Sequence, residues 1–402
     1  MNEKGSIPEA DVPPPAITPR ELSDKLRRIE DVLNAGRYRG IVIKSEGAMR
    51  WLTGLKHQLG DISPSAISPV NALVVVRGNG QYGIKIAAKP YEIPRLDDEI
   101  PKIFNAVSGL ECKIVESMPE TDPGIMTPEH SGYAETIDRI VRPLVGGFSG
   151  NQYKKLDWLS NMSMKVLAET ARQLKPDMDG LSVRGLLSLN LLKHGIDSNL
   201  VLVALKGQEK HLHPIASSAY RVERDSWMKL VVGARYSEHI VSQSIMVKIG
   251  KPPTKSENTL YMALQDAAVE YADCYRSGAS ESEIYSEMTA RFQNVEDIYG
   301  LKGFSASALL HHPGGGTSPL GNRDRMLSPT GGRIFEPWTS FAINPVDSIE
   351  GFKVEMQGVV QPDDKPPSIL DIAKFANELV GFRKVRSSGG TVAELPDLLT
   401  IG

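Results

Sequence analysis

Two pairs of histidines are the residues of this chain whose type and spacing best suit chemistry. His211 and His213 alternate with a leucine in His-Leu-His-Pro, and His311 and His312 stand together before Pro-Gly-Gly-Gly. An imidazole with a pKa of about 6.5 gives and takes a proton at neutral pH, which suits general acid/base catalysis on a C–N or C–O bond. Either pair could instead pack against a loop or bind backbone carbonyls at the end of a sheet.

Other candidate sites give weaker signals. Glu355 falls in a strand-like apolar run, where a buried carboxylate needs a partner such as a substrate cation, His312 or a structural arginine. The glycine run 314–316 lacks the Lys-Ser/Thr and the helix of a phosphate-binding loop, so it more simply allows a tight turn. Cys112 and Cys274 are too few for a disulfide framework, and no short Cys/His spacing indicates zinc.

Length and composition predict two domains and neither a nucleic-acid nor a membrane partner. At 402 residues and 41% hydrophobic, the chain exceeds one ordinary core. Its formal net charge of −3 comes from acids and bases mixed along the chain, so electrostatics favour neither nucleic acid nor an anionic membrane. The Pro-rich N-terminus lacks the apolar core of a signal peptide, and no apolar run is long enough to span a bilayer. We therefore expect a cytoplasmic protein.

The elements that position these residues begin with an α/β unit. Thr18, Pro19 and Glu21 form a capping-box pattern, and apolar residues at helical spacing then continue to Gly36. A strand at 41–43, a helical stretch at 49–52 and a pair of strands about the turn 78–80 follow. Alternating strands and helices predict an α/β unit that ends near residue 150, after a flexible arm over residues 1–17.

The second unit reads as two helices, strands, two helices and strands again. The expected helices and strands are 156–174, 182–194, 200–205, 229–249, 259–275, a helix capped by Ser280 and Glu283, 341–344 and 353–360. This order predicts an antiparallel sheet covered by helices, with internal pseudo-symmetry as a further hypothesis. The fold class expected for the whole chain is α+β.

Four landmarks in order give the chain a family resemblance. They are Met49–Gly54, the segment 225–250 (DSWMKLVVGARYSEHIVSQSIMVKIG), a His followed by Gly and then an x-Pro step, and a late Glu. This order resembles the pita-bread superfamily of creatinase, prolidase, aminopeptidase P and methionine aminopeptidase. The resemblance implies a creatinase-like N-terminal domain over residues 18–150 and a pita-bread catalytic domain over residues 151–402.

The resemblance also implies that the usual metal site is missing. The metallopeptidases of this superfamily bind two bridged divalent ions through two Asp, one His and two Glu. The matching positions here are Val231, Ser242, His312, Asn344 and Glu355. Because three carboxylates are lost, we expect no dinuclear site and no cofactor.

Creatinase itself, which cleaves a C–N bond without metal, indicates what the remaining residues could do. The resemblance makes His213 the general acid/base, with His312 as a second acid/base or hydrogen-bond donor and Glu355 as the contact for a substrate cation. Arg323 resembles the arginine that clamps a substrate carboxylate. Further substrate contacts implied are Ser242, Ser244, Asn344, His211, His311, Lys56 and His57. Creatinase has a glutamate where this chain has Ser244, which argues against creatine as substrate.

The leading hypothesis is therefore a metal-independent, creatinase-like enzyme that hydrolyses, or otherwise cleaves or rearranges, a C–N bond in a small zwitterionic, amino-acid-like substrate. A non-catalytic binding or scaffold protein of the same fold is the alternative, and a metallopeptidase with displaced ligands is a third. The resemblance further implies a homodimer, in which the region of Lys56 and His57 completes the partner's pocket.

Overall fold

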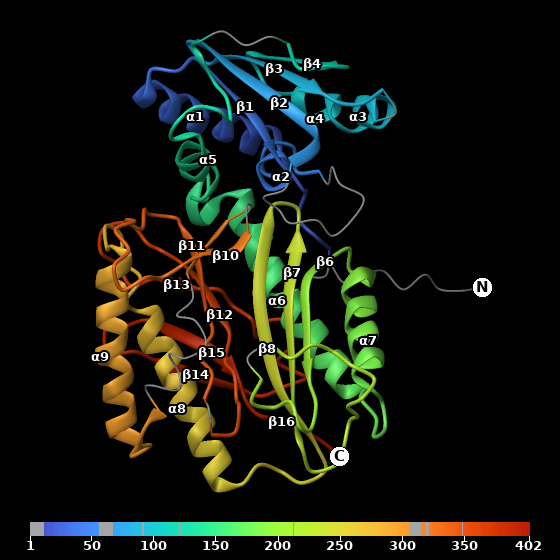
Figure 1. Ribbon diagram of the computed structural model, residues 1–402, viewed down its shortest axis with the longest axis vertical. Coiled ribbons are helices and arrows are strands. Elements are labelled where there is room, and N and C mark those ends of the chain that lie inside the picture. The colour runs from blue at the N-terminus through green and yellow to red at the C-terminus, as the bar shows by residue number, and fades with distance from the viewer. Residues whose placement is uncertain are drawn as a thin grey trace, which may run out of the picture.

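The computed structural model describes residues 12–55, 67–90, 92–119, 123–211, 213–304, 315–318, 321–347 and 349–402. The chain forms two lobes stacked along its long axis, the smaller one built from the N-terminal part (Figure 1). Lys56 and His57 lie outside the described residues. Mixed helices and sheets confirm the predicted α+β class.

The first helix forms as its capping pattern predicts. In α1 (Pro19–Gly36) the Thr18 hydroxyl accepts a hydrogen bond from the Glu21 amide, and Arg37 ends the helix in the left-handed conformation. The buried apolar stripe faces the sheet: Leu22, Leu26, Ile29 and Leu33. Local sequence and burial thus agree on this element.

The N-terminal sheet has the strand order β4-β3-β2-β1-β5. Its strands are β1 (Gly40–Ser45), β2 (Ile67–Gly78), β3 (Gln81–Ala87), β4 (Leu110–Val115) and β5 (Ile125–Met126). Asn79 and Gly80 take positive φ values in the β2–β3 turn, which the Asn-Gly pair allows at little cost. The remaining helices of this lobe are α2 (Glu46–Thr53), α3 (Ile93–Glu99), α4 (Pro101–Phe104) and α5 (Tyr133–Val141).

The second lobe begins with two helices against a four-stranded sheet. After the 3-10 turn η2 (Gly147–Ser149), α6 (Asn151–Arg172) and α7 (Gly180–Lys193) precede β6 (Asp197–Ala204), β7 (Trp227–Tyr236) and β8 (His239–Ile249). These strands pair antiparallel. The C-terminal strand β16 (Leu399–Ile401) adds to the same sheet and pairs parallel with β8. The sheet is thus antiparallel as predicted, with one parallel strand added at its edge.

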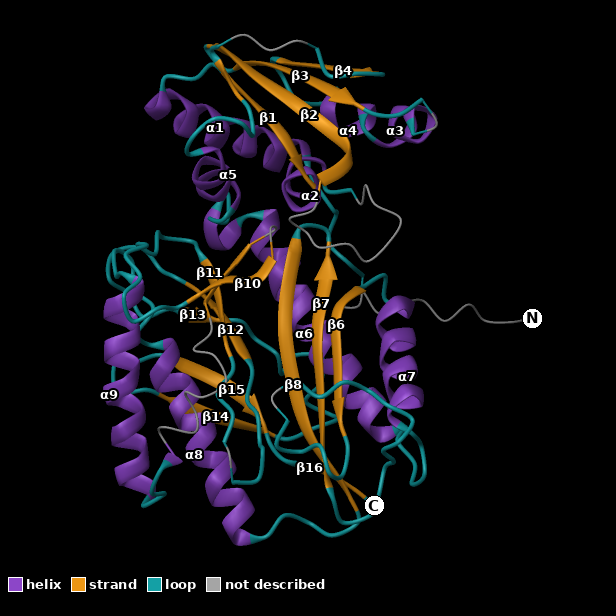
Figure 2. Cartoon of the chain, viewed as in Figure 1, coloured by secondary structure: helices purple, strands orange, loops and turns teal. Residues whose placement is uncertain are grey.

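The second helix pair precedes a five-stranded sheet. Helices α8 (Lys255–Ala272) and α9 (Glu281–Tyr299) lie on the side opposite α7 (Figure 2). The sheet order is β10-β9-β11-β12-β13. Its strands are β9 (Gly315–Ser318), β10 (Gly321–Met326), β11 (Ser340–Ile343), β12 (Met356–Val359) and β13 (Ser368–Ile369), and β14 (Phe382–Arg386) pairs with β15 (Val392–Pro396).

The β7–β8 hairpin separates two apolar cores. Leu230 and Val232 pack into the core with α6 and α7, whereas Trp227 and Met246 pack with α8, α9, β11 and β12. Since side chains alternate along a strand, the hairpin presents one face to each core. Among the described helices, none is both long and apolar enough to cross a membrane.

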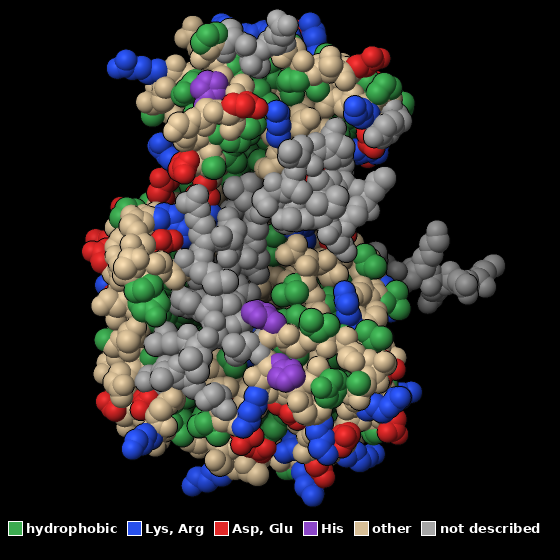
Figure 3. All heavy atoms as spheres, viewed as in Figure 1, with side chains coloured by type: hydrophobic (Ala, Val, Ile, Leu, Met, Phe, Trp, Pro, Cys, Tyr) green, Lys and Arg blue, Asp and Glu red, His purple; other side chains and the backbone are tan. Residues whose placement is uncertain are grey.

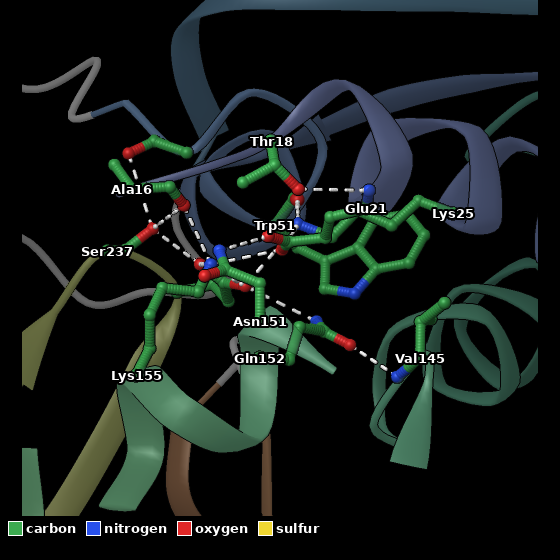
Figure 4. A network of polar contacts seen from close by, with 12 residues as sticks. Ala16, Thr18, Glu21, Lys25, Trp51, Val145, Asn151, Gln152, Lys155 and Ser237 are labelled. Atoms are coloured by element: carbon green, nitrogen blue, oxygen red, sulfur yellow. Dashed lines mark hydrogen bonds and ion pairs between the residues drawn. The ribbon is translucent and has the colours of Figure 1, made fainter. Parts of the chain in front are cut away.

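A buried group of charges joins the two lobes at the tip of this hairpin (Figure 4). Glu238, fully buried, accepts from Lys155 of α6 at 2.7 and 2.8 Å and from Lys25 of α1 at 3.3 Å. Glu21 lies 2.6 Å from Lys25 and 3.0 Å from Lys155. Two ammonium groups and two carboxylates, all buried, therefore neutralise one another.

This arrangement controls the charge state of Glu238. Burial alone would raise its pKa, but Lys155 and Lys25 outweigh burial and hold that pKa well below its ordinary value of 4.5. Burial likewise disfavours the Lys25 ammonium, yet Glu21 and Glu238 raise its pKa. Glu238 and Lys25 therefore both favour their charged forms, so their pairing is obligatory.

The last residues of the predicted flexible arm are held against the second lobe. The Pro14 carbonyl accepts from Tyr236 Oη at 2.6 Å, and the Ala16 carbonyl accepts from Lys155 Nζ at 2.7 Å. Ile17 is buried. Residues 14–17 therefore belong to the interface between the lobes rather than to a free arm.

Removing the Glu238 carboxylate should destabilise the contact between the two lobes. We expect Glu238→Gln to lower the free energy of unfolding by about 3–5 kcal/mol, because it leaves two buried ammonium groups undercompensated. Denaturant unfolding at pH 7 measures this. A matched control is Glu223→Gln, which breaks the exposed pair with Lys206 and should cost no more than about 1 kcal/mol.

The same carboxylate gives a pH signature. A lowered folded-state pKa contributes stability above the unfolded-state value, and that contribution is lost as pH falls through the folded-state pKa. The stability gap between wild type and Glu238→Gln should therefore shrink as pH falls below about 4.5. A gap that stays constant to the acid limit would contradict the ionised state of Glu238.

Candidate active site

The β7–β8 hairpin carries the first two matched positions on one face. Strand register places Val231 opposite Ser244, with Ser242 two residues along on the same side. Gln243 points the other way and donates to a serine of α6 at 2.9 Å. Val231 and both serines are buried toward the second sheet, where the Ser244 hydroxyl donates to the Lys353 carbonyl at 3.5 Å.

The other two described positions meet at the ends of β11 and β12. The last pair in register joins Ile343 to Met356, so Asn344 directly follows one strand and Glu355 directly precedes the other. Both side chains are buried, at 1% and 2% exposure. The two sheets thus bring Val231, Ser242, Asn344 and Glu355 into the interior between them.

An ammonium group occupies the immediate surroundings of Glu355. Lys353 Nζ lies 2.6 Å from Glu355 Oε1, and the two side chains are 2% and 0% exposed. One residue separates them in extended chain, so both point to the same side. An ion pair of this length, buried on both sides, couples the two charges strongly.

A second buried lysine secures the loop that carries the first histidine pair. Lys229 of β7 donates to the carbonyls of Glu209, His211 and Gly351 at 3.0, 3.3 and 3.1 Å. Burial, with a smaller repulsion from Lys353, lowers the pKa of Lys229 to about 8. Lys229 therefore anchors the 209–211 loop to the same interior that holds Lys353.

A buried acid, Asp347, lies near Lys229. Its carboxylate accepts the backbone N–H groups of Ile349, Glu350 and Phe352 at 2.8, 2.7 and 2.6 Å, and so closes the loop between β11 and β12. Burial raises the pKa of Asp347 in spite of these bonds. Asp347 thus stabilises the backbone of residues 349–352, which leads into Lys353.

The predicted site residues fall into three groups. Ser242, Ser244, Asn344 and Glu355 are brought together by strand pairing. His211 and His213 are exposed on the loop before β7. Figure 3 shows histidine side chains at the surface of the larger lobe. The remaining predictions lie outside the described residues, or have side chains outside them: His311, His312, Arg323, Lys56 and His57.

The sequence interpretation missed both lysines. Lys353 stands two residues before Glu355 in a run whose period of two puts both on one face of a strand, so the pair could have been expected. Lys229 precedes Val231 by the same spacing. A lysine inside an apolar strand is unusual enough to mark a buried charge that needs a partner.

A known sequence family covers this part of the chain. The profile that describes metallopeptidase family M24 matches residues 156–376, more than half of the chain. This chain belongs to metallopeptidase family M24. The matched residues include the β7–β8 hairpin, Lys353 and Glu355. The family match confirms the resemblance to the pita-bread superfamily. No curated protein sequence matches the chain.

Solved structures share its fold at low identity. The dipeptidase PepE from Mycobacterium ulcerans is 13% identical over 96% of this chain and 99% of its own, with a TM-score of 0.62. The prolidase from Pyrococcus horikoshii is 13% identical over 86% and 97%, with a TM-score of 0.61. The N-terminal domain of the chickpea FACT subunit SPT16 is 11% identical over 90% and 99%, with a TM-score of 0.59.

The described residues at the matched positions do not fit the two metal ions of the metallopeptidases. The Val231 side chain has no atom that can bind a metal ion, and Ser242 and Asn344 offer only neutral oxygens. Glu355 is the one carboxylate among these described positions, and it already lies 2.6 Å from the Lys353 ammonium. Within the described part of the chain, no group of three or more His, Cys, Asp or Glu is arranged to hold a metal.

The Lys353–Glu355 pair can be tested by its energetics. We expect Lys353→Met alone to destabilise the protein by about 3–5 kcal/mol, because it strands a buried carboxylate. The double variant Lys353→Met/Glu355→Leu should recover most of that loss, since neither charge remains. Unfolding free energies of the two variants measure this, and a double variant less stable than the single one would contradict the pairing.

Proposed function

We propose that this M24 chain is a hydrolase that works without a metal ion and cleaves a C–N bond in a small amino-acid-like substrate. The observation that supports this most is the buried Lys353 ammonium, 2.6 Å from the surviving glutamate position. Family membership associates the chain with peptidase-type hydrolysis, and the donor set disfavours metal at this site. A fixed cation of the protein itself then supplies the positive charge.

Lys353 can do part of what a metal ion does for hydrolysis. As water adds to a carbonyl or amidino carbon, negative charge develops on the substrate heteroatom, and a preorganised cation in a dry site stabilises it. Glu355 balances the charge of Lys353 and orients its side chain. Unlike a metal ion, an ammonium does not acidify a bound water to neutral pKa, so a separate base has to activate the nucleophile.

His213 is the proposed base. It lies on the loop whose backbone Lys229 holds through the carbonyls of Glu209 and His211. A neutral imidazole can take a proton from the attacking water and return it to the leaving nitrogen as the C–N bond breaks. His312 and Arg323 remain proposals for a second donor and a carboxylate clamp.

The substrate proposed is a small zwitterion, and a homodimer is the proposed assembly. Glu355 would share its charge between Lys353 and a substrate cation, while Ser242, Ser244 and Asn344 add neutral hydrogen-bonding groups to the same interior. Binding of creatine itself is disfavoured, because a serine stands where creatinase has its second substrate glutamate. The region of Lys56 and His57 is proposed to complete the partner's pocket.

Activity tests follow from these roles. A panel of amide, ureido and amidino derivatives of amino acids is screened for release of the nitrogen product. For any substrate found, His213→Ala should lower kcat at least about 100-fold with an unchanged unfolding transition. The control His194→Ala, at the C-terminal end of α7, should leave kcat unchanged. Equal rates for wild type and His213→Ala would sink the assignment.

A second candidate, a binding or scaffold protein, is favoured by one specific observation. Lys229 donates hydrogen bonds to three backbone carbonyls, and Asp347 accepts hydrogen bonds from three backbone amides. Both charged groups therefore stabilise loops, which is a structural role. One structural neighbour is a domain of a subunit of the FACT complex. A stoichiometric protein partner, combined with no turnover across the panel, would favour this candidate.

A further inference from the structure

A cleft between the two lobes lies away from the candidate active site. It has a volume of about 670 Å³, and its walls are one face of α1 and the segments 143–146 and 336–338. That volume is in the range of small-ligand pockets. Trp338 lines the cleft at one end of β11, and Asn344 follows the other end, so six extended residues, about 20 Å, separate the two places.

Charges along α1 form a row in this cleft. The row consists of Arg20, Asp24, Arg27, Arg28 and Asp31. The charges in the middle of the row are balanced by ion pairs. Arg27 pairs with Asp24 in the row itself, and Arg28 lies 3.1 Å from Glu336 of the opposite wall. Gly146 of the opposite wall approaches Asp24, so the second lobe faces the middle of the row.

The two ends of the row are left without such partners. Neither Arg20 nor Asp31 makes a hydrogen bond or ion pair to any residue in the described ranges, and both are exposed. Arg20 also stands in the first turn of α1, where the helix dipole disfavours a cation, so it does not serve the helix. The eleven residue steps from Arg20 to Asp31 correspond to a rise along the helix of about 16 Å.

Trp338 gives this cleft an aromatic wall in a strained conformation. Its φ of 65° is in the left-handed region, which bulky residues rarely adopt. Backbone bonds impose it: Trp338 N–H donates to the Val360 carbonyl and its own carbonyl accepts from Leu144, both at 2.8 Å. Strain held in this way is typical of ligand-contacting positions.

We propose that this cleft binds a short peptide with free termini, about four residues long. Extended chain covers roughly 3.5 Å per residue, so four residues match the distance between the charged ends. The peptide carboxylate pairs with the Arg20 fork, the amino group with Asp31, and an apolar side chain packs against Trp338. This site is independent of the hydrolase proposed above, and its failure would leave that proposal intact.

Isothermal titration of the full chain with Ala-Ala-Phe-Ala tests the proposal. Blocking the amino group by acetylation, or the carboxylate by amidation, should each weaken binding about fivefold. In Asp31→Asn, acetylation should have no further effect, and in Arg20→Gln, amidation should have no further effect. Mass spectrometry of the peptide after each titration separates binding here from hydrolysis elsewhere.

Two outcomes decide the matter against the proposal. Binding that is absent in wild type, or that responds to blocking equally in wild type and in both variants, would overturn it. The variants change exposed side chains of α1, so their unfolding transitions should match wild type. The dipeptide Phe-Ala, too short to reach both ends, should bind at least about fivefold more weakly than the tetrapeptide.

Discussion

A fully buried carboxylate, Glu238 at the tip of the β7–β8 hairpin, is the constraint on which the arrangement of this molecule depends. Its charge is compensated by Lys155 from the same lobe and Lys25 from the other, with Glu21 completing the balance. Buried ion pairs contribute little net stability, but they tolerate no missing partner. The two lobes are therefore fixed relative to each other by a requirement for charge pairing, in addition to apolar contact.

The same hairpin links this joint to the candidate site. Its tip holds the charge cluster, and its middle presents Val231, Ser242 and Ser244 to the second sheet. At the candidate site a buried carboxylate is again paired with a buried ammonium, since Glu355 lies against Lys353. In a metallopeptidase the carboxylates of such a site are balanced by cations from solution. In this chain, one carboxylate is balanced by a side chain placed two residues before it.

Much of the fold was predictable from local sequence, and the charge pairs were not. The capping residues Thr18 and Ser280 begin helices as expected, although the box of Thr254 and Glu257, which starts α8 at Lys255, was overlooked. The β-rich run 229–249 predicted the strands of the hairpin. Glu238 and its partner Lys25 are 213 residues apart, so no local signal joins them. Pairing at such separation is set by tertiary packing alone.

Metal content of the purified, undenatured protein tests the central claim that an internal ammonium replaces the metal ions. Mass spectrometry is run after dialysis against manganese, cobalt and zinc, with unfolding measured in parallel with and without a chelator. The account predicts less than about one tenth of an ion per chain and no effect of the chelator on stability. One or two bound ions per chain, with stability lost on chelation, would contradict it and assign the site to a metallopeptidase.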